Sequence, residues 1–151
     1  MCSQAKPVTI LMADDDDEDY MLTAEALREA RILNPLYRVK DGEELMEYLL
    51  LKGKYSSRAD APLPSLILLD LNMPKKDGRE ALKEIEDHAE LRKIPVVVLT
   101  TSEAKGDISQ CYEIGANSYI TKPVTFDGLV KTLKTLAQYW FEIVELPPQS
   151  P

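Results

Sequence analysis

The 151-residue chain has few of the residues on which many sites are built, since it contains two cysteines and a single histidine, His88. Two cysteines cannot form a disulfide framework, and neither has a His or Cys nearby at metal-ligand spacing. One histidine excludes any mechanism that needs a histidine cluster. Basic residues are also scarce: 18 Lys and Arg stand against 26 Asp and Glu, a net charge of −8. That charge argues against binding to nucleic acid, which needs clustered positive charge.

Long apolar runs are missing as well. No run approaches the roughly 20 residues that a membrane span needs, and the first six residues hold no apolar segment typical of a secretory signal. A content of 44% hydrophobic and 29% charged residues is typical of a soluble globular chain. We therefore expect one cytoplasmic domain over residues 8–144, between short tails at residues 1–7 and 145–151.

Short apolar runs alternate with helical patterns, which is typical of a parallel sheet covered by helices on both faces. The apolar runs predict strands at residues 8–13, 36–39, 65–69, 95–99 and 118–121. Amphipathic spacing and turn signals predict helices at residues 17–30, 43–51, 78–87, 107–114 and 127–143. The polar stretch 53–64 is predicted to be a loop. The expected fold class is α/β, a (βα)5 chain with one layer of parallel strands between two layers of helices.

Charged and hydroxyl side chains follow four of the predicted strands. They are Asp14 and Asp15 after the first strand, Asp70 after the third, Thr100 after the fourth and Lys122 after the fifth. Sites in open parallel sheets form beyond the carboxyl ends of the strands, so we expect these side chains to meet at one edge. Carboxylate oxygens are ligands that Mg²⁺ prefers. A carboxylate beside a metal ion and a lysine can attack a phosphoryl group.

Simpler interpretations exist for several of these residues. The acidic run 16–19 is interpreted as a solvated helix start, favoured by the helix dipole, with Asp16 or Asp17 as the cap. Asp70 could merely end its strand, and Lys122 could be a surface lysine in a turn. Each signal is weak when taken alone, so their order along the chain decides the interpretation.

Together the motifs closely resemble the receiver domain of two-component response regulators. The motifs are Asp14-Asp15, Asp70 with Asn72-Met73-Pro74, Asp77-Gly78, Thr100-Thr101 and Lys122-Pro123. The resemblance covers residues 8–136, nearly the whole chain. It implies the family's flavodoxin-like three-layer sandwich, with the parallel sheet in the order 2-1-3-4-5.

The resemblance also implies a role for each residue. Asp70 would accept a phosphoryl group from the phosphohistidine of a histidine kinase, and Lys122 would pair with the phosphoryl oxygens. Thr100 would hydrogen-bond the phosphoryl group and draw the fourth strand inward. The implied ligands of Mg²⁺ are Asp14, Asp15, Asp70 and the backbone carbonyl of Asn72.

Two further positions are assigned by the same resemblance. Tyr119 occupies the family's aromatic switch position and would rotate inward with Thr100, although half-buried packing on the sheet is the alternative explanation. Pro123 would follow the family's cis Lys-Pro bond. Cys111 has no legible function and is interpreted as core packing.

A finer likeness concerns the partner. The long loop 53–64, the motifs at 98–102 and 119–122, and the end from Trp140 to Pro147 look like the small stand-alone regulators of bacterial, especially cyanobacterial, phytochromes. The implied partners are a sensor histidine kinase of phytochrome type and an unidentified downstream protein, because one helix and a tail leave no room for an output domain. The protein would be a phosphoacceptor rather than an enzyme, assisting its own phosphorylation and dephosphorylation with Mg²⁺.

Two alternatives to this function stay open. A phosphohydrolase of the haloacid dehalogenase type also uses an aspartate nucleophile and Mg²⁺, and Asp70-Leu71-Asn72 partly matches its Asp-x-Asp motif, but the second acid is missing. A receiver that only binds partners is the other alternative. Nothing in the sequence recommends it, because the whole set of site residues is present.

The last predicted helix has apolar residues on two faces. The stripe expected to face the core consists of Leu129, Leu133, Leu136, Trp140 and Ile143. A second stripe, rotated by about 100°, consists of Val130, Ala137, Phe141 and Val144. Exposed apolar patches mark interfaces, so we expect a homodimer through the second stripe. The alternative is a wide face that packs entirely on the sheet.

Overall fold

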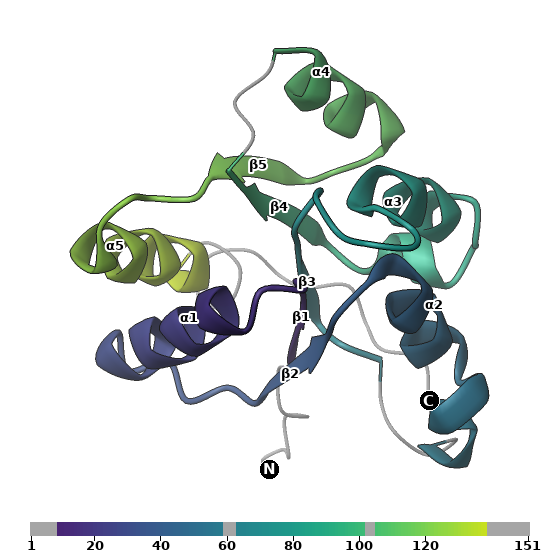
Figure 1. Ribbon diagram of the computed structural model, residues 1–151, viewed down its shortest axis with the longest axis horizontal. Coiled ribbons are helices and arrows are strands. Elements are labelled where there is room, and N and C mark those ends of the chain that lie inside the picture. Colours follow the sequence, from purple (N-terminus) through teal and green to yellow (C-terminus); the bar gives the residue numbers. More distant parts are fainter. Residues whose placement is uncertain (1–8, 59–62, 102–104, 139–151) are drawn as a thin grey trace, which may run out of the picture.

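The computed structural model describes residues 9–58, 63–101 and 105–138, in which five strands alternate with five α-helices (Figure 1). The strands are β1 (Ile10–Ala13), β2 (Leu36–Val39), β3 (Leu66–Leu69), β4 (Val96–Thr100) and β5 (Ser118–Thr121). The α-helices are α1 (Asp17–Glu29), α2 (Gly42–Leu50), α3 (Gly78–Glu86), α4 (Lys105–Ile114) and α5 (Phe126–Ala137). Two 3-10 helices are η1 (Gly53–Arg58) and η2 (Leu91–Lys93).

The strands form one parallel sheet in the order β2-β1-β3-β4-β5, which confirms the predicted fold class and strand order. The register aligns Ala13 of β1 with Leu69 of β3, and Leu69 with Val98 of β4. Thr100 of β4 is aligned with Thr121 of β5. The residues that follow β1, β3, β4 and β5 are therefore brought to one edge of the sheet.

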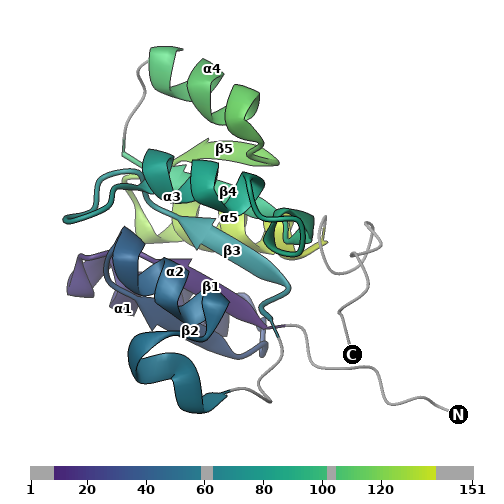
Figure 2. The same cartoon turned by 90° about the vertical axis from the view of Figure 1, so that its right-hand side faces the viewer.

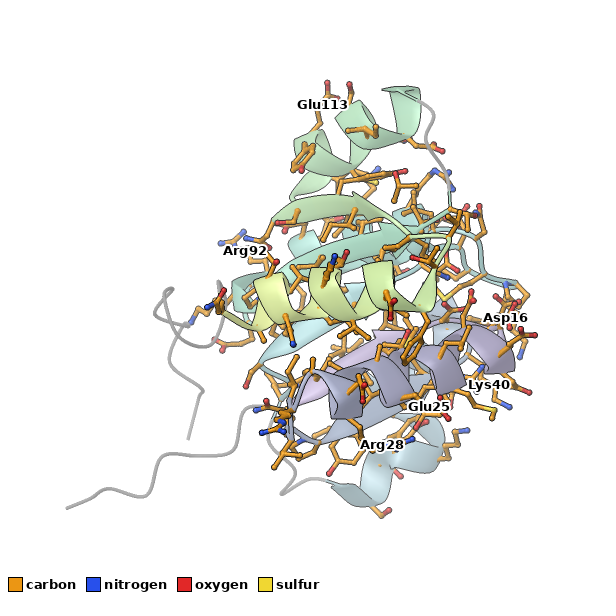
Figure 3. The ribbon with its side chains drawn as sticks, turned by 90° about the vertical axis from the view of Figure 1, so that its left-hand side faces the viewer. Asp16, Glu25, Arg28, Lys40, Arg92 and Glu113 are labelled. Atoms are coloured by element: carbon orange, nitrogen blue, oxygen red, sulfur yellow. The ribbon has the colours of Figure 1, made fainter. Side chains whose placement is uncertain are left out.

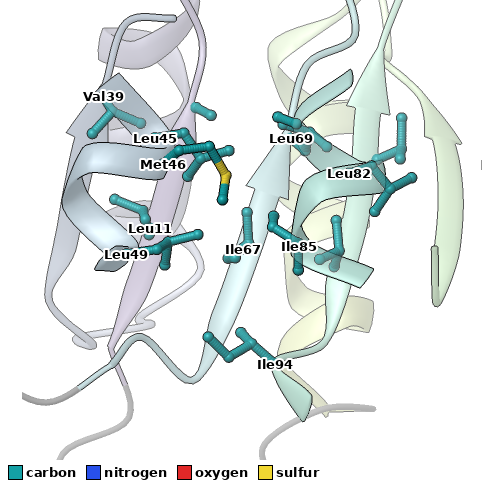
Figure 4. Packing of buried hydrophobic residues seen from close by; sticks show 14 of the residues in the cluster. Leu11, Val39, Leu45, Met46, Leu49, Ile67, Leu69, Leu82, Ile85 and Ile94 are labelled. Carbon is teal, nitrogen blue, oxygen red and sulfur yellow. The ribbon is translucent and has the colours of Figure 1, made fainter. Parts of the chain in front are cut away.

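Two cores lie on opposite faces of the sheet. Helices α2, α3 and α4 cover one face (Figure 2). Leu11 and Ile67 point to this face (Figure 4), and Val98 belongs to the same core. Helices α1 and α5 cover the other face (Figure 1). Met12 and Leu68 belong to the core on that face. Successive residues of a strand point to opposite faces, so a strand buried on both sides must be apolar throughout. This is why β1, β3 and β4 read as unbroken apolar runs. Cys111 of α4 is fully buried in the first core, which confirms its interpretation as core packing.

The predicted element boundaries agree with the structure except at a few ends. β4 continues to Thr100, and α4 begins at Lys105 rather than at residue 107. Helix α5 is described as far as Ala137, so the predicted continuation to residue 143 and both predicted tails lie outside the described residues. The short helix η2 was not among the predicted elements.

The predicted loop 53–64 contains the helix η1, because side chains hold this segment on α2. The hydroxyl of Tyr55 donates to Glu44 Oε2 at 2.5 Å, and Lys54 Nζ lies 2.8 Å from the same oxygen. The other oxygen of Glu44 accepts from the backbone N–H of Lys40 at 2.8 Å. The Tyr55 ring packs edge-on against Tyr48 with 5.0 Å between centroids. Burial and the hydrogen bond to Glu44 raise the pKa of Tyr55 to about 12.

Two glycine amides hold the loop between β3 and α3, which carries Asn72. The N–H of Gly42 donates to the carbonyl of Lys76 at 2.9 Å, and the N–H of Gly78 donates to the carbonyl of Leu71 at 3.0 Å. Both glycines are in close contact with backbone atoms of this segment. The backbone that carries Asn72 is thereby fixed from both sides.

The two ends of the fold differ in which groups they present. Asp16 and Lys40 lie at the end where the strands have their carboxyl ends, whereas Arg92 lies at the opposite end (Figure 3). The acidic residues that follow the strands are therefore displayed at one end of the sheet.

None of the described helices combines the length and apolar character needed to cross a membrane.

Gly78→Ala should lower the free energy of unfolding by about 1–3 kcal/mol, because overpacking forces the backbone apart. A Cβ atom at this position would lie 2.4 Å from the carbonyl oxygen of Asp70. Urea denaturation measures the effect. The control is Gly106→Ala in α4, where the added Cβ would have no atom within 4 Å apart from its chain neighbours and the nearby backbone of its own helix, so that variant should be as stable as wild type or more so. Equal stability of Gly78→Ala and wild type would contradict the close approach.

Candidate functional site

Three carboxylates from the ends of two adjacent strands form the centre of the site. Asp14 and Asp15 follow β1, Asp70 follows β3, and the N–H of Asp70 donates to the carbonyl of Ala13 at 3.0 Å. One oxygen of each carboxylate lies within 4.8 Å of the other two. Asp14 and Asp70 are buried, whereas Asp15 is exposed. The structure thus brings together the three acids that the sequence places at strand ends.

Both oxygens of Asp70 have polar partners. Oδ1 accepts from the hydroxyl of Thr100 at 2.9 Å and from the backbone N–H of Asn72 at 3.1 Å. Oδ2 lies 3.2 Å from the ammonium of Lys122. Thr100 is fully buried at the end of β4, so its hydroxyl reaches Asp70 from the neighbouring strand. Asp70 is held in one orientation by groups from three separate segments.

Lys122 is the cation of the site. It follows β5, and its backbone N–H donates to the carbonyl of Thr100 at 2.7 Å. Its Nζ lies 2.8 Å from Asp14 Oδ2, 2.7 Å from Asp19 Oδ2 and 3.2 Å from Asp70 Oδ2. Its side chain is 12% exposed, so these attractions are poorly screened by solvent. The interpretation of Lys122 as a surface lysine is therefore wrong.

Burial raises the pKa of a carboxyl group and lowers the pKa of an ammonium group. It raises the pKa of the Asp14 carboxyl above its usual range, and the hydrogen bond from Lys122 offsets this only in part. Burial alone would lower the pKa of the Lys122 ammonium, but the hydrogen bonds to Asp14 and Asp19 and the charge of Asp70 raise it instead. Lys122 is accordingly charged at neutral pH.

The acidic run after Asp15 divides into residues with different roles. Asp16 caps α1, since its side chain accepts from the N–H groups of Glu18 and Asp19, as predicted. Asp17 is exposed and pairs with Arg38 at 2.7 Å. The interpretation of Asp19 as merely solvated is wrong, because it contacts Lys122. Side chains in the first turn of a helix lean back toward the helix start, which here is the edge that carries the site. That tendency was the available signal for Asp19, and it does not single out this residue within the turn.

Two predicted residues lie around this centre rather than in it. Asn72 is exposed, and its backbone N–H contacts Asp70. Tyr119 lies on β5 opposite Val98, half-buried against the core under α3 and α4, and its backbone N–H donates to the hydroxyl of Tyr112 at 3.0 Å. This position agrees with the packing alternative, and the switch role of Tyr119 stays a prediction. The Lys122–Pro123 peptide bond is trans, so the cis bond implied by the resemblance is absent from this structure.

An apolar pocket of about 410 Å³ opens directly beside Lys122. Asp19 and Lys122 form its polar end, and its other walls come from α1, the end of β4, the segment 123–125 and the start of α5. Three apolar side chains of these walls, Leu22, Val124 and Phe126, are 39%, 101% and 38% exposed. An exposed apolar surface therefore borders the polar site.

The expected second stripe of α5 is corrected in part. Val130 is buried in the core with Leu133 and Leu136, so it does not face outward. Ala137 is half-buried and lines a small gap in the same core. The reason is that α5 packs against α1 and also shares a core with side chains of the sheet, which widens the buried face of the helix. Phe141 and Val144 lie outside the described residues.

The donor set fits a small divalent cation. Three carboxylate oxygens that converge within 4.8 Å are the hard ligands that Mg²⁺ and Mn²⁺ accept. Carboxylates this close also repel one another unless cations compensate them, and Lys122 supplies one positive charge. The site therefore combines an oriented carboxylate, a hydroxyl, an ammonium and ligands for a metal ion.

Comparison with known proteins supports a single family. The family model of the response regulator receiver domain matches residues 10–134. Response regulator Rcp1 of Synechocystis is 42% identical over 141 residues, which make up 93% of this chain and 94% of Rcp1. The crystal structure of the phosphorylated cyanobacterial phytochrome response regulator RcpA is 40% identical with a TM-score of 0.87, covering 95% of this chain and 100% of that one.

A second solved structure bears on the metal. The Mn²⁺-bound form of Rcp1 is 42% identical with a TM-score of 0.84, covering 94% of this chain and 100% of that one. Its metal agrees with the acidic cluster of Asp14, Asp15 and Asp70 as a place for a divalent ion. Because the family model and these relatives span nearly the whole sequence, the chain belongs to the response regulator receiver domain family and is a homologue of the phytochrome response regulators Rcp1 and RcpA.

Proposed function

We propose that the protein is a single-domain response regulator that accepts a phosphoryl group on Asp70 from a sensor histidine kinase. The observation that carries this proposal is the environment of Asp70, whose oxygens contact the Thr100 hydroxyl and the Lys122 ammonium beside two further carboxylates. The haloacid dehalogenase alternative loses its support, since the chain matches the receiver family over residues 10–134.

In the proposed reaction, a carboxylate oxygen of Asp70 forms a bond to phosphorus as the P–N bond of a phosphohistidine breaks. The kinase histidine leaves with the electron pair of that bond. Lys122 and the Thr100 hydroxyl stabilise the charge on the phosphoryl oxygens. Hydrolysis of the acyl phosphate by water would release inorganic phosphate and return Asp70 to its free form, and we propose that the protein assists this step with Mg²⁺.

We propose that the metal ion is Mg²⁺ and that Asp14, Asp15, Asp70 and the carbonyl of Asn72 would hold it. When bound, it would neutralise charge on the phosphoryl group. The residues of the chain hold the phosphoryl acceptor in place, because Asp70 has partners on both oxygens. A set of oxygen donors prefers a hard cation such as Mg²⁺, which keeps several water molecules as its other ligands.

Phosphorylation would act as a switch through the same contacts. A dianionic phosphoryl group attracts Lys122 and Thr100 more strongly than a carboxylate does, and Tyr119 would move inward with Thr100. Shifting a two-state equilibrium from 1:99 to 99:1 needs about 5.5 kcal/mol of differential binding. Hydrogen bonds to charged groups, at about 1.5–3 kcal/mol each, can supply it.

We further propose that the kinase is of the phytochrome type and that the protein acts in the cytoplasm. Support comes from the similarity to Rcp1 and RcpA, of which RcpA is described as a cyanobacterial phytochrome response regulator. The output would pass through contact with a downstream protein, in a form that involves neither nucleic acid nor membrane. The pocket beside Lys122 places an apolar surface next to the site that would be phosphorylated.

Asp70→Asn should abolish phosphorylation, because an amide cannot form the acyl phosphate. Intact mass is measured after incubation with Mg²⁺ and an autophosphorylated phytochrome-type histidine kinase. Wild type should gain one phosphoryl group that hydroxylamine removes, and the variant should gain none. Asp17→Asn, a change at an exposed acid of the same run, is the matched control and should react like wild type. A phosphoryl group on Asp70→Asn would refute Asp70 as the acceptor.

Lys122→Ala should retain part of the phosphorylation but lose the conformational response. The reason is that the ammonium links Asp70, which follows β3, to the backbone after β5. Backbone amide spectra of phosphorylated and unphosphorylated protein measure the response at the ends of β4 and β5. Lys134→Ala, at an exposed position of α5, is the control. A response of Lys122→Ala equal to that of wild type would contradict this account.

We keep the homodimer through the last helix as a prediction. With Val130 buried, the surface would depend on Ala137, Phe141 and Val144. Light scattering at tens of micromolar, with and without phosphorylation, measures the mass in solution. Wild type should run as a dimer and Phe141→Glu as a monomer. A monomeric wild type under both conditions would exclude this interface.

A further inference from the structure

One carboxylate partner of Lys122, Asp19, lies outside the group of Asp14, Asp15 and Asp70. Asp19, in the first turn of α1, places Oδ2 2.7 Å from the ammonium, closer than Asp70 at 3.2 Å. Asp19 does not belong to the group of Asp14, Asp15 and Asp70 that converges as a metal site. Its contact with the site is therefore through Lys122.

The three partners of Lys122 differ in how firmly they are held. The second oxygen of Asp14 accepts from the N–H of Asp16, and that of Asp70 accepts from Thr100 and Asn72. The side chains of Asp14 and Asp70 are 1% and 10% exposed, whereas that of Asp19 is 34% exposed. If Lys122 moves away, water can hydrate the partly exposed Asp19 at a small cost in free energy. A buried carboxylate that lost its partner would instead destabilise the folded protein strongly.

An ammonium group has three N–H donors, and three carboxylates surround the one in this structure. Phosphorylation of Asp70 replaces the contact of Lys122 with Asp70 Oδ2 by contacts with phosphoryl oxygens, of which the group has three. Lys122 can bind a second of these oxygens only if it also gives up Asp14 or Asp19. The exposed partner costs least to release. Asp19 is therefore the group that Lys122 would exchange for the phosphoryl group.

We propose that Asp19 is a positioning residue that competes with the phosphoryl group for Lys122 and thereby favours the unphosphorylated state. This inference rests on the proposed phosphorylation of Asp70. It adds that the Asp19 carboxylate is an acceptor that competes for the same lysine. Asp19 and Lys122 both line the pocket that also contains Leu22 and Val124. The exchange of partners would change the polar end of that pocket.

The test is a calorimetric titration of the whole protein with beryllofluoride, a phosphoryl mimic, in excess Mg²⁺. Asp19→Asn should bind about two- to fivefold more tightly than wild type, the size expected when one partly exposed ion pair no longer competes. Asp19→Glu restores the carboxylate and should return the affinity close to that of wild type. Glu18→Gln removes the same charge from the same exposed turn without a partner role at Lys122, and it should have no comparable effect.

A double-mutant cycle separates competition for Lys122 from a general effect of charge. In a Lys122→Gln background, Asp19→Asn should leave the affinity for beryllofluoride unchanged, because the contact is already lost. A gain of the same size in that background would overturn the proposal. Unchanged or weaker binding of Asp19→Asn in the wild-type background would overturn it as well, since weaker binding would mean that Asp19 holds Lys122 in place for the phosphoryl group.

The same titration distinguishes failure of this proposal from failure of the proposed function. If wild type and Glu18→Gln bind the mimic and Asp70→Asn does not, the acceptor is established and only the role of Asp19 is in question. If wild type does not bind, or Asp70→Asn binds equally well, the assignment of Asp70 fails. Circular dichroism confirms that each variant is folded before titration.

Discussion

At the carboxyl edge of the sheet, carboxylates that repel one another are held together by a single ammonium group. Lys122 lies within 3.2 Å of oxygens from Asp14 and Asp19, in the segment from β1 into α1, and from Asp70 after β3. Little solvent surrounds the ammonium, so the carboxylates attract it strongly. This attraction raises the pKa of Lys122 although burial alone would lower it. Because Lys122 contacts Asp70 directly, negative charge added at Asp70 would attract it, and the proposed switch and the proposed role of Asp19 both depend on that attraction.

The charged site also links the ends of neighbouring strands of the sheet. Thr100 contacts Asp70 through its hydroxyl and the backbone of Lys122 through its carbonyl, so the ends of β3, β4 and β5 are linked through one buried residue. Beyond β4, the position of α4 is held by the bidentate pair of Arg79 and Asp107, whose atoms approach to 2.7 Å. A change in the partners of Asp70 can therefore reach β4 and β5 directly.

Most of the fold was predictable because the apolar runs and helical stripes are short, distinct and alternating. Unbroken runs such as 66–69 can be satisfied only by a strand covered on both faces. The prediction was weaker where neighbouring elements decide the outcome. Val130 could not be assigned to a face from spacing, because α5 packs on both the sheet and α1. The helix η1 depends on contacts of Tyr55 and Lys54 with Glu44, which lies on a different helix.

The sequence by itself determined the strand-end acids, the threonine and the lysine, and their order indicated the receiver family before any geometry was known. The physical reason is that parallel strands carry the residues after their carboxyl ends to one edge. Only the tertiary structure decided which of these groups touch. It showed that Asp19, and not Asp16 or Asp17, contacts Lys122, because that contact depends on how α1 is placed against the segment after β5. Distances between charges on separate elements are set by packing, and no spacing along the chain encodes them.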